Sequence, residues 1–360
     1  MLPARAKTVL SSLALVAAAL AASPACADDV LLIPDSGLDR VWSFSPVDGA
    51  LLSDSFIASD GVISQPIQIA ESGNGTLLIT DEVANSLFEY SLDGTYIRTL
   101  IGTIHGTVGL YGVCVHDGYA YVTQPSSVDA LNRRVWRVKT DGSAAPELWL
   151  DCSALGIAPR GIVRWQQKGF DGFLLGDSEG DNLIRVALDG TIVNNFVDSD
   201  GVTGIDFPQQ IHKLPDGGCL VAGFTAPSGL YTYDSSGTTL AIELGIFVAP
   251  RGVHVLDNGE FLYTGGTRVQ AWNQFFQTDR EIVNSDPAGA PFSSFRWITR
   301  VTLKSSPCPA DIDGSGLVDG ADLAALLTGW GGAGTGDING SGEVDAADLA
   351  ILLGAWGACP

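Results

Sequence analysis

The sequence predicts an all-β body, a six-bladed β-propeller of four-stranded blades, followed by a small α-helical domain with paired EF-hand-type loops. Three observations lead to this fold class. Residues 30–304 repeat with a period of 42–49 residues, each period contains four short strand-like runs, and two copies of an Asp/Gly-rich stretch close the chain. We expect residues 28–304 to form the propeller and residues 305–360 the helical domain, with residues 1–27 as a leader.

Two independent landmarks set the repeat period. A turn that enters an apolar strand recurs at spacings of 44, 49, 49 and 42 residues, at Pro66-Ile67, Leu110-Tyr111, Pro159-Arg160, Pro208-Gln209 and Pro250-Arg251. A hairpin turn recurs at spacings of 45, 48, 48 and 47 residues, at Asp48-Gly49, Asp93-Gly94, Asp141-Gly142, Asp189-Gly190 and Ser236-Gly237. Two markers that share one period indicate tandem supersecondary units.

The second period shows its four strands most clearly, over residues 67–71, 76–80, 86–91 and 96–100. These runs are rich in β-branched and aromatic residues and are separated by turn residues, which is typical of short antiparallel strands. Four strands per period of this length are the pattern of a propeller blade.

The two ends of the repeat are incomplete. The first period begins at a second strand, residues 30–34, and residues 295–303 form a strand without a blade of its own. Because an unpaired strand edge is a liability, we expect residues 295–303 to supply the missing inner strand and close the ring.

Two stretches of the body, from Asn85 to Arg98 and from Asp177 to Val193, resemble blades of the NHL-repeat family. The resemblance implies the propeller fold. Asp35, Asp81 and Asp177 recur at the ends of second strands, where we expect them to accept hydrogen bonds from turns rather than to act in catalysis.

Polar side chains recur on the predicted inner strands, near the channel mouth. Arg160 and Arg251 are equivalent in the fourth and sixth blades, and His212 and His254 are equivalent in the fifth and sixth. The arginines suit a carboxylate, such as that of a uronic acid, and the histidines suit a transition metal or general-base catalysis. The alternative for all four is strand-end capping or packing between blades.

A zinc site needs a third protein ligand, and the other blades carry no histidine at the equivalent position, where they have Ala70, Cys114 and Val163. Glutamines on the same strands offer amides for sugar hydroxyls; they are Gln68, Gln209 and Gln210. Fold alone does not assign a function to any of these residues.

The closing stretches run over residues 311–322 and 337–348, 26 residues apart. Each has oxygen-bearing side chains at loop positions 1, 3, 5, 9 and 12, Gly at position 6 and a backbone carbonyl at position 7, which is the ligand pattern of an EF-hand calcium loop. The expected ligands of two Ca²⁺ ions are Asp311, Asp313, Ser315, Leu317, Asp319 and Asp322, and Asp337, Asn339, Ser341, Glu343, Asp345 and Asp348. Position 12 is Asp rather than the longer Glu, so we expect an affinity of roughly 10⁻⁴–10⁻³ M.

An apolar helix is expected after each loop. Leu323, Leu326 and Leu327 share one helical face, and Leu349, Leu352 and Leu353 share the other, so we expect the two faces to pack on each other. A duplicated calcium loop plus helix resembles a type I dockerin module.

That resemblance implies a cohesin-like protein on a scaffold or a cell surface as the partner. The partner contacts of the family fall on Gly320-Ala321 and Ala346-Ala347, which are small here, unlike the polar pairs of well-known cohesin binders. Cys308 and Cys359 bracket the module, and we expect them to form a disulfide.

The start of the chain predicts export. Arg5 and Lys7 precede an apolar run over residues 9–22, and Ala25-Cys26-Ala27 offers small residues before a cut, as in a bacterial secretory signal. We therefore expect a secreted or cell-surface protein that does not span the membrane. The net charge of −22 argues against nucleic acid as a partner.

Removing the leader leaves five cysteines, an odd number. The pairing of Cys114, Cys152 and Cys219 stays open, although Cys114 and Cys219 lie in strand-like runs that suit buried, unreactive thiols.

Two functions from different classes remain open. The leading hypothesis is a secreted ligand-binding propeller, with carbohydrate as the ligand, on a calcium-binding tail that attaches it to a cohesin-like or surface partner. The alternative is a hydrolase or lyase that acts on a polysaccharide or a lactone at the channel mouth, because dockerin-like tails often accompany glycan-degrading enzymes. In that case the catalytic candidates are His212, His254, Arg160 and Arg251.

Overall fold

The computed structural model describes residues 29–303 except 126–131, 245–248 and 286–291, and residues 310–358 except 314, 316, 333, 335 and 340. The chain divides into a unit that spans Asp28–Lys304 and a unit that contains Ser305–Pro360. The expected leader lies outside the described residues. Within the described ranges no helix is long and apolar enough to cross a membrane.

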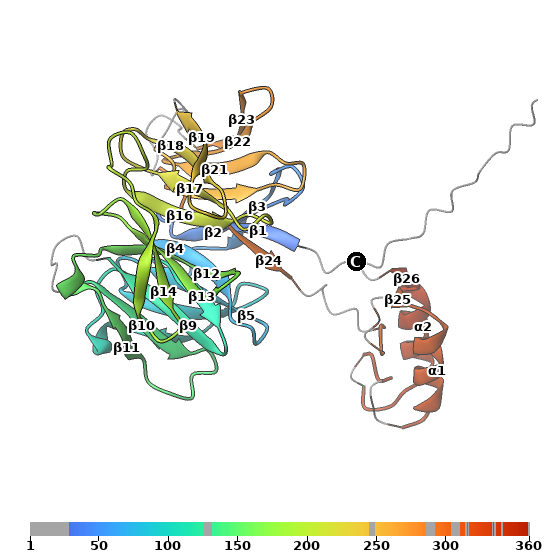
Figure 1. The fold of residues 1–360 in the computed structure, drawn as a ribbon. Helices are drawn as coiled ribbons and strands as arrows, with labels where there is room; N and C mark the ends of the chain where they lie inside the picture. Colours follow the sequence, from blue (N-terminus) through green and yellow to red (C-terminus); the bar gives the residue numbers. More distant parts are fainter. Residues whose placement is uncertain are drawn as a thin grey trace, which may run out of the picture. The chain divides into compact units, whose positions relative to one another are not determined.

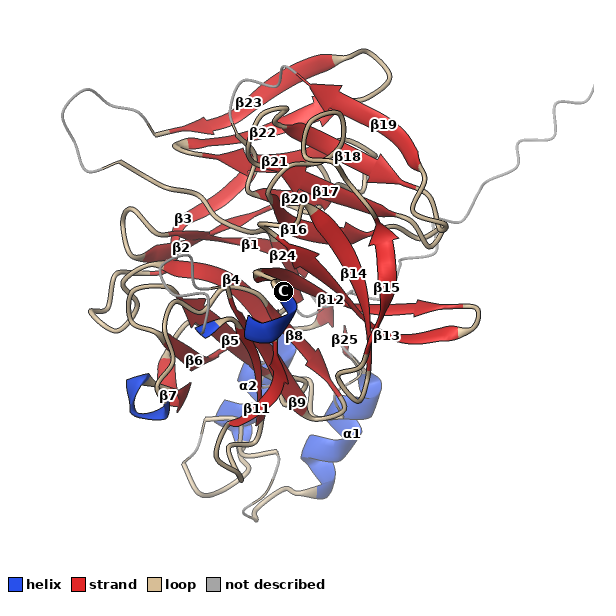
Figure 2. Cartoon of the chain, turned by 60° about the vertical axis from the view of Figure 1, so that its left-hand side comes forward, coloured by secondary structure: helices blue, strands red, loops and turns tan. Residues whose placement is uncertain are grey.

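The described part of the first unit forms six four-stranded antiparallel sheets, which confirms the predicted six-bladed propeller (Figures 1 and 2). In order from inner to outer strand, blade 1 contains β24 (Thr299–Thr302), β1 (Asp29–Asp35), β2 (Arg40–Phe44) and β3 (Leu51–Ile57). Blade 2 contains β4 (Pro66–Glu71), β5 (Thr76–Asp81), β6 (Ser86–Ser91) and β7 (Tyr96–Ile101). Blade 3 contains β8 (Val113–His116), β9 (Tyr119–Gln124), β10 (Arg134–Lys139) and β11 (Glu147–Asp151).

The remaining three blades follow the same order without a crossover. Blade 4 contains β12 (Pro159–Gln167), β13 (Phe170–Asp177), β14 (Asn182–Ala187) and β15 (Ile192–Val197). Blade 5 contains β16 (Pro208–Lys213), β17 (Cys219–Gly223), β18 (Gly229–Tyr233) and β19 (Thr239–Leu244). Blade 6 contains β20 (Gly252–Val255), β21 (Phe261–Gly265), β22 (Arg268–Asn273) and β23 (Thr278–Asn284).

Blade 1 closes the ring with strands from both ends of the unit. β24 pairs antiparallel with β1, with Asp29 opposite Thr302 and Leu32 opposite Thr299, and an isolated bridge joins Asp35 to Phe295. This pairing confirms that the segment of residues 295–303 supplies the missing inner strand, although the strand itself covers only Thr299–Thr302. It satisfies the backbone edge of β1, which would otherwise be unpaired.

Apolar side chains fill the space between neighbouring sheets. Blades 1 and 2 share a core that includes Leu32, Val41, Ile69 and Phe88, and blades 4 and 5 share one around Trp165. Each sheet is covered on both faces, so strands such as β5 are continuous apolar runs rather than alternating ones.

The second-strand aspartates have the turn role expected for them. One oxygen of Asp81 accepts the N–H groups of Ser64 and Gln65, and the other accepts those of Val83 and Ala84. Asp35 likewise accepts from Gly37 and Ser294, and Asp177 accepts from Ala158 and Glu179. Buried carboxylates satisfied in this way connect the loops on one side of the ring.

The described part of the second unit has two short helices, α1 (Gly320–Thr328) and α2 (Ala346–Gly354), and a two-residue ladder between β25 (Leu317–Val318) and β26 (Gly357–Ala358). A capping box starts each helix, with Asp319 and Asp322 in α1 and Asp345 and Asp348 in α2. Cys308 and Cys359 lie outside the described residues, so their disulfide remains a prediction.

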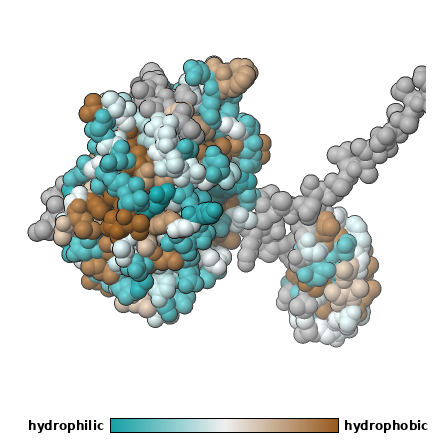
Figure 3. Space-filling view, in the orientation of Figure 1, coloured by the Kyte–Doolittle hydropathy of each residue, from teal (hydrophilic) through white to brown (hydrophobic). Residues whose placement is uncertain are grey.

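The expected packing of the two helical faces is only partly right. Leu326 and Leu352 are buried together with Val318 and Val344, whereas Leu327 and Leu353 are 51% and 53% exposed. Two nine-residue helices are too short to cover every leucine. Apolar side chains therefore remain on the surface of this unit, where Figure 3 shows brown patches.

Candidate functional site at the channel mouth

The six inner strands surround the propeller axis (Figure 2). One residue at or just before the start of each inner strand is equivalent in the sequence repeat. In blade order these residues are Arg296, Ile67, Tyr111, Arg160, Gln209 and Arg251. The backbone N–H of Tyr111, Arg251 and Arg296 each donates to a carbonyl of the second strand in the same blade. The ring-closing strand thus adds a third arginine to the two that the sequence predicts.

The sequence landmark does not include Arg296, because its segment has neither the Pro that precedes four of its equivalents nor the Gly that follows three of them. Phe295 nevertheless follows Pro250 by 45 residues, which matches the repeat period. Applying the period once more, to the ring-closing strand, is the signal that finds it.

Threonines on second strands fix the backbone of this ring. The hydroxyls of Thr123 and Thr264 donate to the carbonyls of Arg160 and Arg296 in the next blade, each at 2.6 Å. The same hydroxyls accept from the N–H groups of Gly112 and Gly252 in their own blade, at 2.7 and 2.8 Å. The arginine backbones are therefore held by hydrogen bonds between blades.

Glycine is required at these inner-strand positions because two backbones approach closely. A Cβ on Gly112 would lie 2.5 Å from the carbonyl oxygen of Arg160, and a Cβ on Gly252 would lie 2.5 Å from that of Arg296. The Gly that follows Tyr111 and Arg251 in the sequence landmark has this packing reason.

Arg160 has the most enclosed of the three guanidinium groups. Its side chain is 9% exposed, and its guanidinium carbon lies 4.2 Å from the ring centroid of Tyr111 and 4.7 Å from that of Phe207. Its Nε has no hydrogen-bond partner. Burial lowers the pKa of Arg160, and the neighbouring Tyr111 acts in the opposite direction.

Arg251 and Arg296 are tethered to serines. Nη1 of Arg251 donates to Oγ of Ser294 at 3.1 Å, and Nε of Arg296 donates to Oγ of Ser36 at 2.6 Å. Burial, together with the charge of Arg296, lowers the pKa of Arg251 to about 10. We call Arg160, Arg251 and Arg296 the arginine mouth.

One carboxylate accompanies the arginine mouth. Oε2 of Glu82 lies 3.6 Å from Nη2 of Arg296, and its charge also acts on Arg160 and Arg251. Among the described residues neither Arg160 nor Arg251 forms an ion pair. With three arginines and one glutamate, the arginine mouth carries an excess positive charge, although the net charge of the whole chain is −22. Such an arrangement is suited to bind an anion.

The predicted histidine pair does come together, further along the inner strands. The ring centroids of His212 and His254 are 4.6 Å apart at an interplanar angle of 70°. Burial lowers the pKa of His212 to about 4, and burial with the charges of His212 and Arg300 lowers that of His254 to about 3. Within the described residues no Asp, Glu, Cys or third His joins the pair as a three-ligand group, so the geometry favours packing between blades over a transition-metal site.

Two of the glutamines expected to bind sugar hydroxyls are structural instead. Oε1 of Gln210 accepts the N–H groups of Val253 and Ile298, and its Nε2 donates to the carbonyl of Ile298. Oε1 of Gln68 accepts from the N–H of Val113 at 2.8 Å. These amides connect inner strands whose edges have no ladder partner. The third, Gln209, is buried at the inner-strand position of blade 5 that is equivalent to those of Arg160 and Arg251.

The cysteines of the propeller are free thiols, which answers the open question of their pairing. Burial raises the pKa of Cys114 and that of Cys152 to about 12, and it also raises that of Cys219. Cys114 lines a cavity of about 310 Å³ with other inner-strand residues such as Val163 and Thr299. A thiol with so high a pKa is a poor nucleophile.

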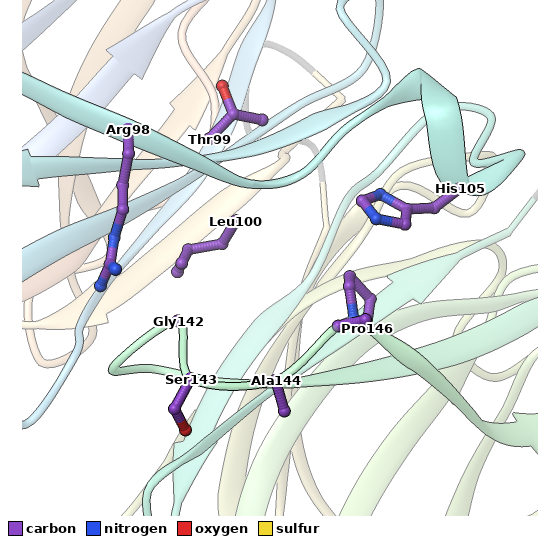
Figure 4. Close-up of a pocket in the computed structure, with 9 residues that line it drawn as sticks. Arg98, Thr99, Leu100, His105, Gly142, Ser143, Ala144 and Pro146 are labelled. Atoms are coloured by element: carbon purple, nitrogen blue, oxygen red, sulfur yellow. The ribbon is translucent and has the colours of Figure 1, made fainter.

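A second hollow, of about 280 Å³, lies on the outer side of blades 2 and 3 (Figure 4). Arg98 and His105 lie on opposite sides of it, with Ser143 and Pro146 along one edge. Nε of Arg98 donates to Oε2 of Glu89 at 2.6 Å, so its charge is already neutralised. This hollow lacks the unpaired charge that the arginine mouth has.

The first tail loop gathers carboxylates as predicted. One oxygen each from Asp311, Asp313 and Asp322 lies within 4.8 Å of the others. The N–H of Ser315 donates to Asp311 and Asp313, which curls the loop around these groups. The carboxylate set and the carbonyl of Leu317 fit a hard cation such as Ca²⁺.

The second tail loop has the same folding pattern. The N–H of Ser341 donates to Asp337 and Asn339, and Oγ of Ser341 donates to the carbonyl of Glu343. Backbone N–H groups of Asp345 and Asn339 hold the pKa of Asp348 below its usual range. Asp319 and Asp345 accept from the N–H groups of Ala321 and Ala347, so position 9 is also the N-cap of each helix.

No family model matches this chain, and no curated protein matches it. Among solved structures, a chain of a nidogen/laminin complex is 16% identical, with 77% of this chain and 99% of that chain covered and a TM-score of 0.60. A Bacteroides caccae protein of unknown function is 16% identical over 76% of this chain and 99% of that one, with a TM-score of 0.54. A catalytically inactive virginiamycin B lyase from Staphylococcus aureus, solved with quinupristin, is 13% identical over 74% and 86%, with a TM-score of 0.51. At these identities the likenesses show the fold alone.

Proposed function

We propose that this protein is an exported ligand-binding β-propeller that holds an anionic ligand at the arginine mouth, on a calcium-binding, dockerin-like tail. One observation carries the proposal: Arg160 is buried, Arg251 is half-buried, and neither forms an ion pair among the described residues. Cations removed from water and left without counterions are costly, and an incoming anion removes that cost.

The surroundings of the guanidinium groups favour a carboxylate on a ring-shaped body. Phe207 and Phe224 are half-buried, and their rings lie 4.7 Å from Arg160 and 5.3 Å from Arg251. A sugar ring can lie against a phenyl face while its carboxylate accepts two N–H donors from a guanidinium. An acidic carbohydrate such as a uronate oligomer therefore combines both features.

Calorimetric titration tests this proposal with oligogalacturonate, against a neutral cello-oligosaccharide of equal length. We expect binding of the acidic oligomer alone, weakened at least tenfold in Arg160→Gln and in Arg251→Gln, because each change removes a charge-assisted hydrogen bond. Arg137→Gln is the matched control, because Arg137 lies on a third strand and pairs with Glu147. Equal affinity in all three variants would place the ligand elsewhere.

For the tail, two Ca²⁺ ions are proposed, held by Asp311, Asp313 and Asp322 in one loop and by the corresponding positions in the other. The ion supplies charge neutralisation to carboxylates that otherwise repel one another. Titration of the full-length protein should give about two ions per chain, and the double substitution Asp311→Ala, Asp337→Ala should abolish the binding heat. Unchanged heat would refute the assignment.

The tail's partner is proposed to be a cohesin-like or cell-surface protein. The exposed, small residues at loop positions 10 and 11 leave the neighbouring helix faces accessible, and apolar side chains such as Leu327 and Leu353 are exposed there. A calcium-dependent pull-down with cohesin domains, repeated in chelator, tests this. Retention that does not depend on calcium would argue against a dockerin-like mode.

A second candidate function, a lyase or hydrolase acting on an acidic glycan, has its own observation. Burial and the neighbouring Asp181 carboxylate raise the pKa of Asp206, which suits a general acid. The next residue, Phe207, has a φ of 53°, its N–H donates to Asp181, and its ring lies against Arg160. Product release from polygalacturonate by the wild-type protein but not by Asp206→Asn would establish it, with Asp198→Asn as the exposed control.

A further inference from the structure

Glu82 occupies a position that recurs in the blades. It is the first residue after a second strand, and its N–H donates to the carbonyl of Gln65, just before the inner strand of its blade. The same hydrogen bond is made by Ser36 to Ser294, by Ser178 to Ala158 and by Phe224 to Phe207. The blade thus keeps its geometry with a neutral residue at this position.

The side chain at this recurrent position faces the arginine mouth in several blades. Ser36 accepts a hydrogen bond from Arg296, and the ring of Phe224 lies beside Arg251. Glu82 has the same place in blade 2, and its side chain is 32% exposed. The remaining two equivalents, Pro125 and Gly266, are neutral as well.

An acidic residue is therefore not needed here for folding, yet this one places its carboxylate among three guanidinium groups. Burial raises the pKa of Tyr111, Arg160 lowers it, and Glu82 raises it further. The charge of Glu82 therefore acts on the tyrosine that packs against Arg160. With Glu82 ionised, the arginine mouth has three positive charges and one negative charge, an excess of two.

We propose that Glu82 is a specificity-determining residue, which occupies one cation of the arginine mouth and sets the preferred ligand at two carboxylates. This inference rests on the proposed function, since it assumes that acidic sugars bind at the arginine mouth. A third ligand carboxylate would meet Arg296 already paired and would be repelled by Glu82.

The test compares mono-, di- and trigalacturonate in calorimetric titrations of the full-length protein at two salt concentrations. The wild-type protein should bind digalacturonate more tightly than monogalacturonate, and it should bind trigalacturonate no more tightly than digalacturonate. In Glu82→Gln, which keeps the shape of the side chain, the rise should continue to the third, with trigalacturonate bound about tenfold more tightly than by wild type. The affinity of Glu82→Gln for trigalacturonate should also fall more steeply with rising salt concentration than the wild-type affinity does.

Two further variants keep the test decisive. Glu82→Ser installs the residue that blades 1 and 4 have at this position, so it should fold and behave like Glu82→Gln. Glu281→Gln removes the same charge from an outer strand and should leave the wild-type charge preference intact.

The outcomes separate this inference from the proposed function. Uronate binding that is unchanged or weaker in both Glu82 variants overturns the role of Glu82 and leaves the anion site standing. If neither the wild-type protein nor any variant binds the three uronates, the anion site itself is wrong, and this inference falls with it.

Discussion

The propeller and the tail each bring like charges close together, but the hydrophobic cores that hold these charges differ greatly in size. In the propeller, Arg160, Arg251 and Arg296 are held by a closed ring of sheets with apolar cores between blades. In the tail, the carboxylates of Asp311, Asp313 and Asp322 lie close to one another. The core of this unit is small and contains Val318, Leu326, Val344 and Leu352. From this comparison we expect the large apolar cores of the propeller to hold its clustered arginines in place, and we expect the small tail to need its proposed counterion in order to fold.

The largest effect expected from this contrast is that of calcium removal. If the tail binds calcium as proposed, the ion at 100 times its dissociation constant would stabilise each site by about 2.7 kcal/mol, and chelation would remove that contribution. Scanning calorimetry of the full-length protein should show the tail transition shifting or vanishing in chelator while the propeller transition stays in place. A parallel shift of both transitions would contradict the contrast.

The next effect concerns an aspartate that has backbone partners instead of an ion. Asp81→Ala should destabilise the propeller by about 3–5 kcal/mol, because four N–H groups lose a buried, charged acceptor. Urea unfolding should give the same loss with and without calcium. Asp93→Ala is the control within the same blade, since that exposed carboxylate accepts from the hairpin turn.

A smaller effect is expected from the histidine pair, which is neutral in the folded state. His254 is 6% exposed, and its folded pKa of about 3 lies below the unfolded value of about 6.5. The unfolded chain therefore binds more protons below pH 6.5, and the propeller loses stability as the pH falls from about 6.5 toward 3. His254→Gln should lose about 2 kcal/mol less than wild type between pH 7 and pH 4.5, as measured by urea midpoints.

The smallest effect separates the two roles of position 9 in the tail loops. Asp345 accepts a hydrogen bond from Ala347 as an N-cap, so Asp345→Asn should keep most of the cap and weaken calcium binding. Asp345→Ala should remove both and cost about 1 kcal/mol more in chelator, judged by the far-ultraviolet circular dichroism of the helices on heating. Equal helicity of the two variants in chelator would show that the cap contributes little.

Local sequence patterns were sufficient to predict much of the fold. The two turn markers located six blades, and the incomplete first period correctly assigned residues 295–303 to the ring-closing strand. Asp311, Asp313 and Asp322 of the first loop also come together as their spacing predicts, because a loop of 12 residues folds mainly on itself. Asp35, Asp81 and Asp177 have the expected turn role for the same reason.

Side-chain roles that depend on contacts between blades were predicted less well. Gln68 and Gln210 were expected to meet a ligand, yet their amides satisfy backbone groups of neighbouring inner strands. Leu327 and Leu353 were expected to be buried and are exposed, because the period of a helix does not say how much partner surface the helix meets.

The sequence by itself determined the repeat, the four-stranded blade, the ring closure and the oxygen-rich loops, since each depends on spacing along the chain. The tertiary structure alone brought Arg296 and Glu82 to Arg160 and Arg251, across a ring whose first and last strands pair. The physical reason is that charge acts through space. Which cations lack a counterion is therefore decided only when distant blades meet.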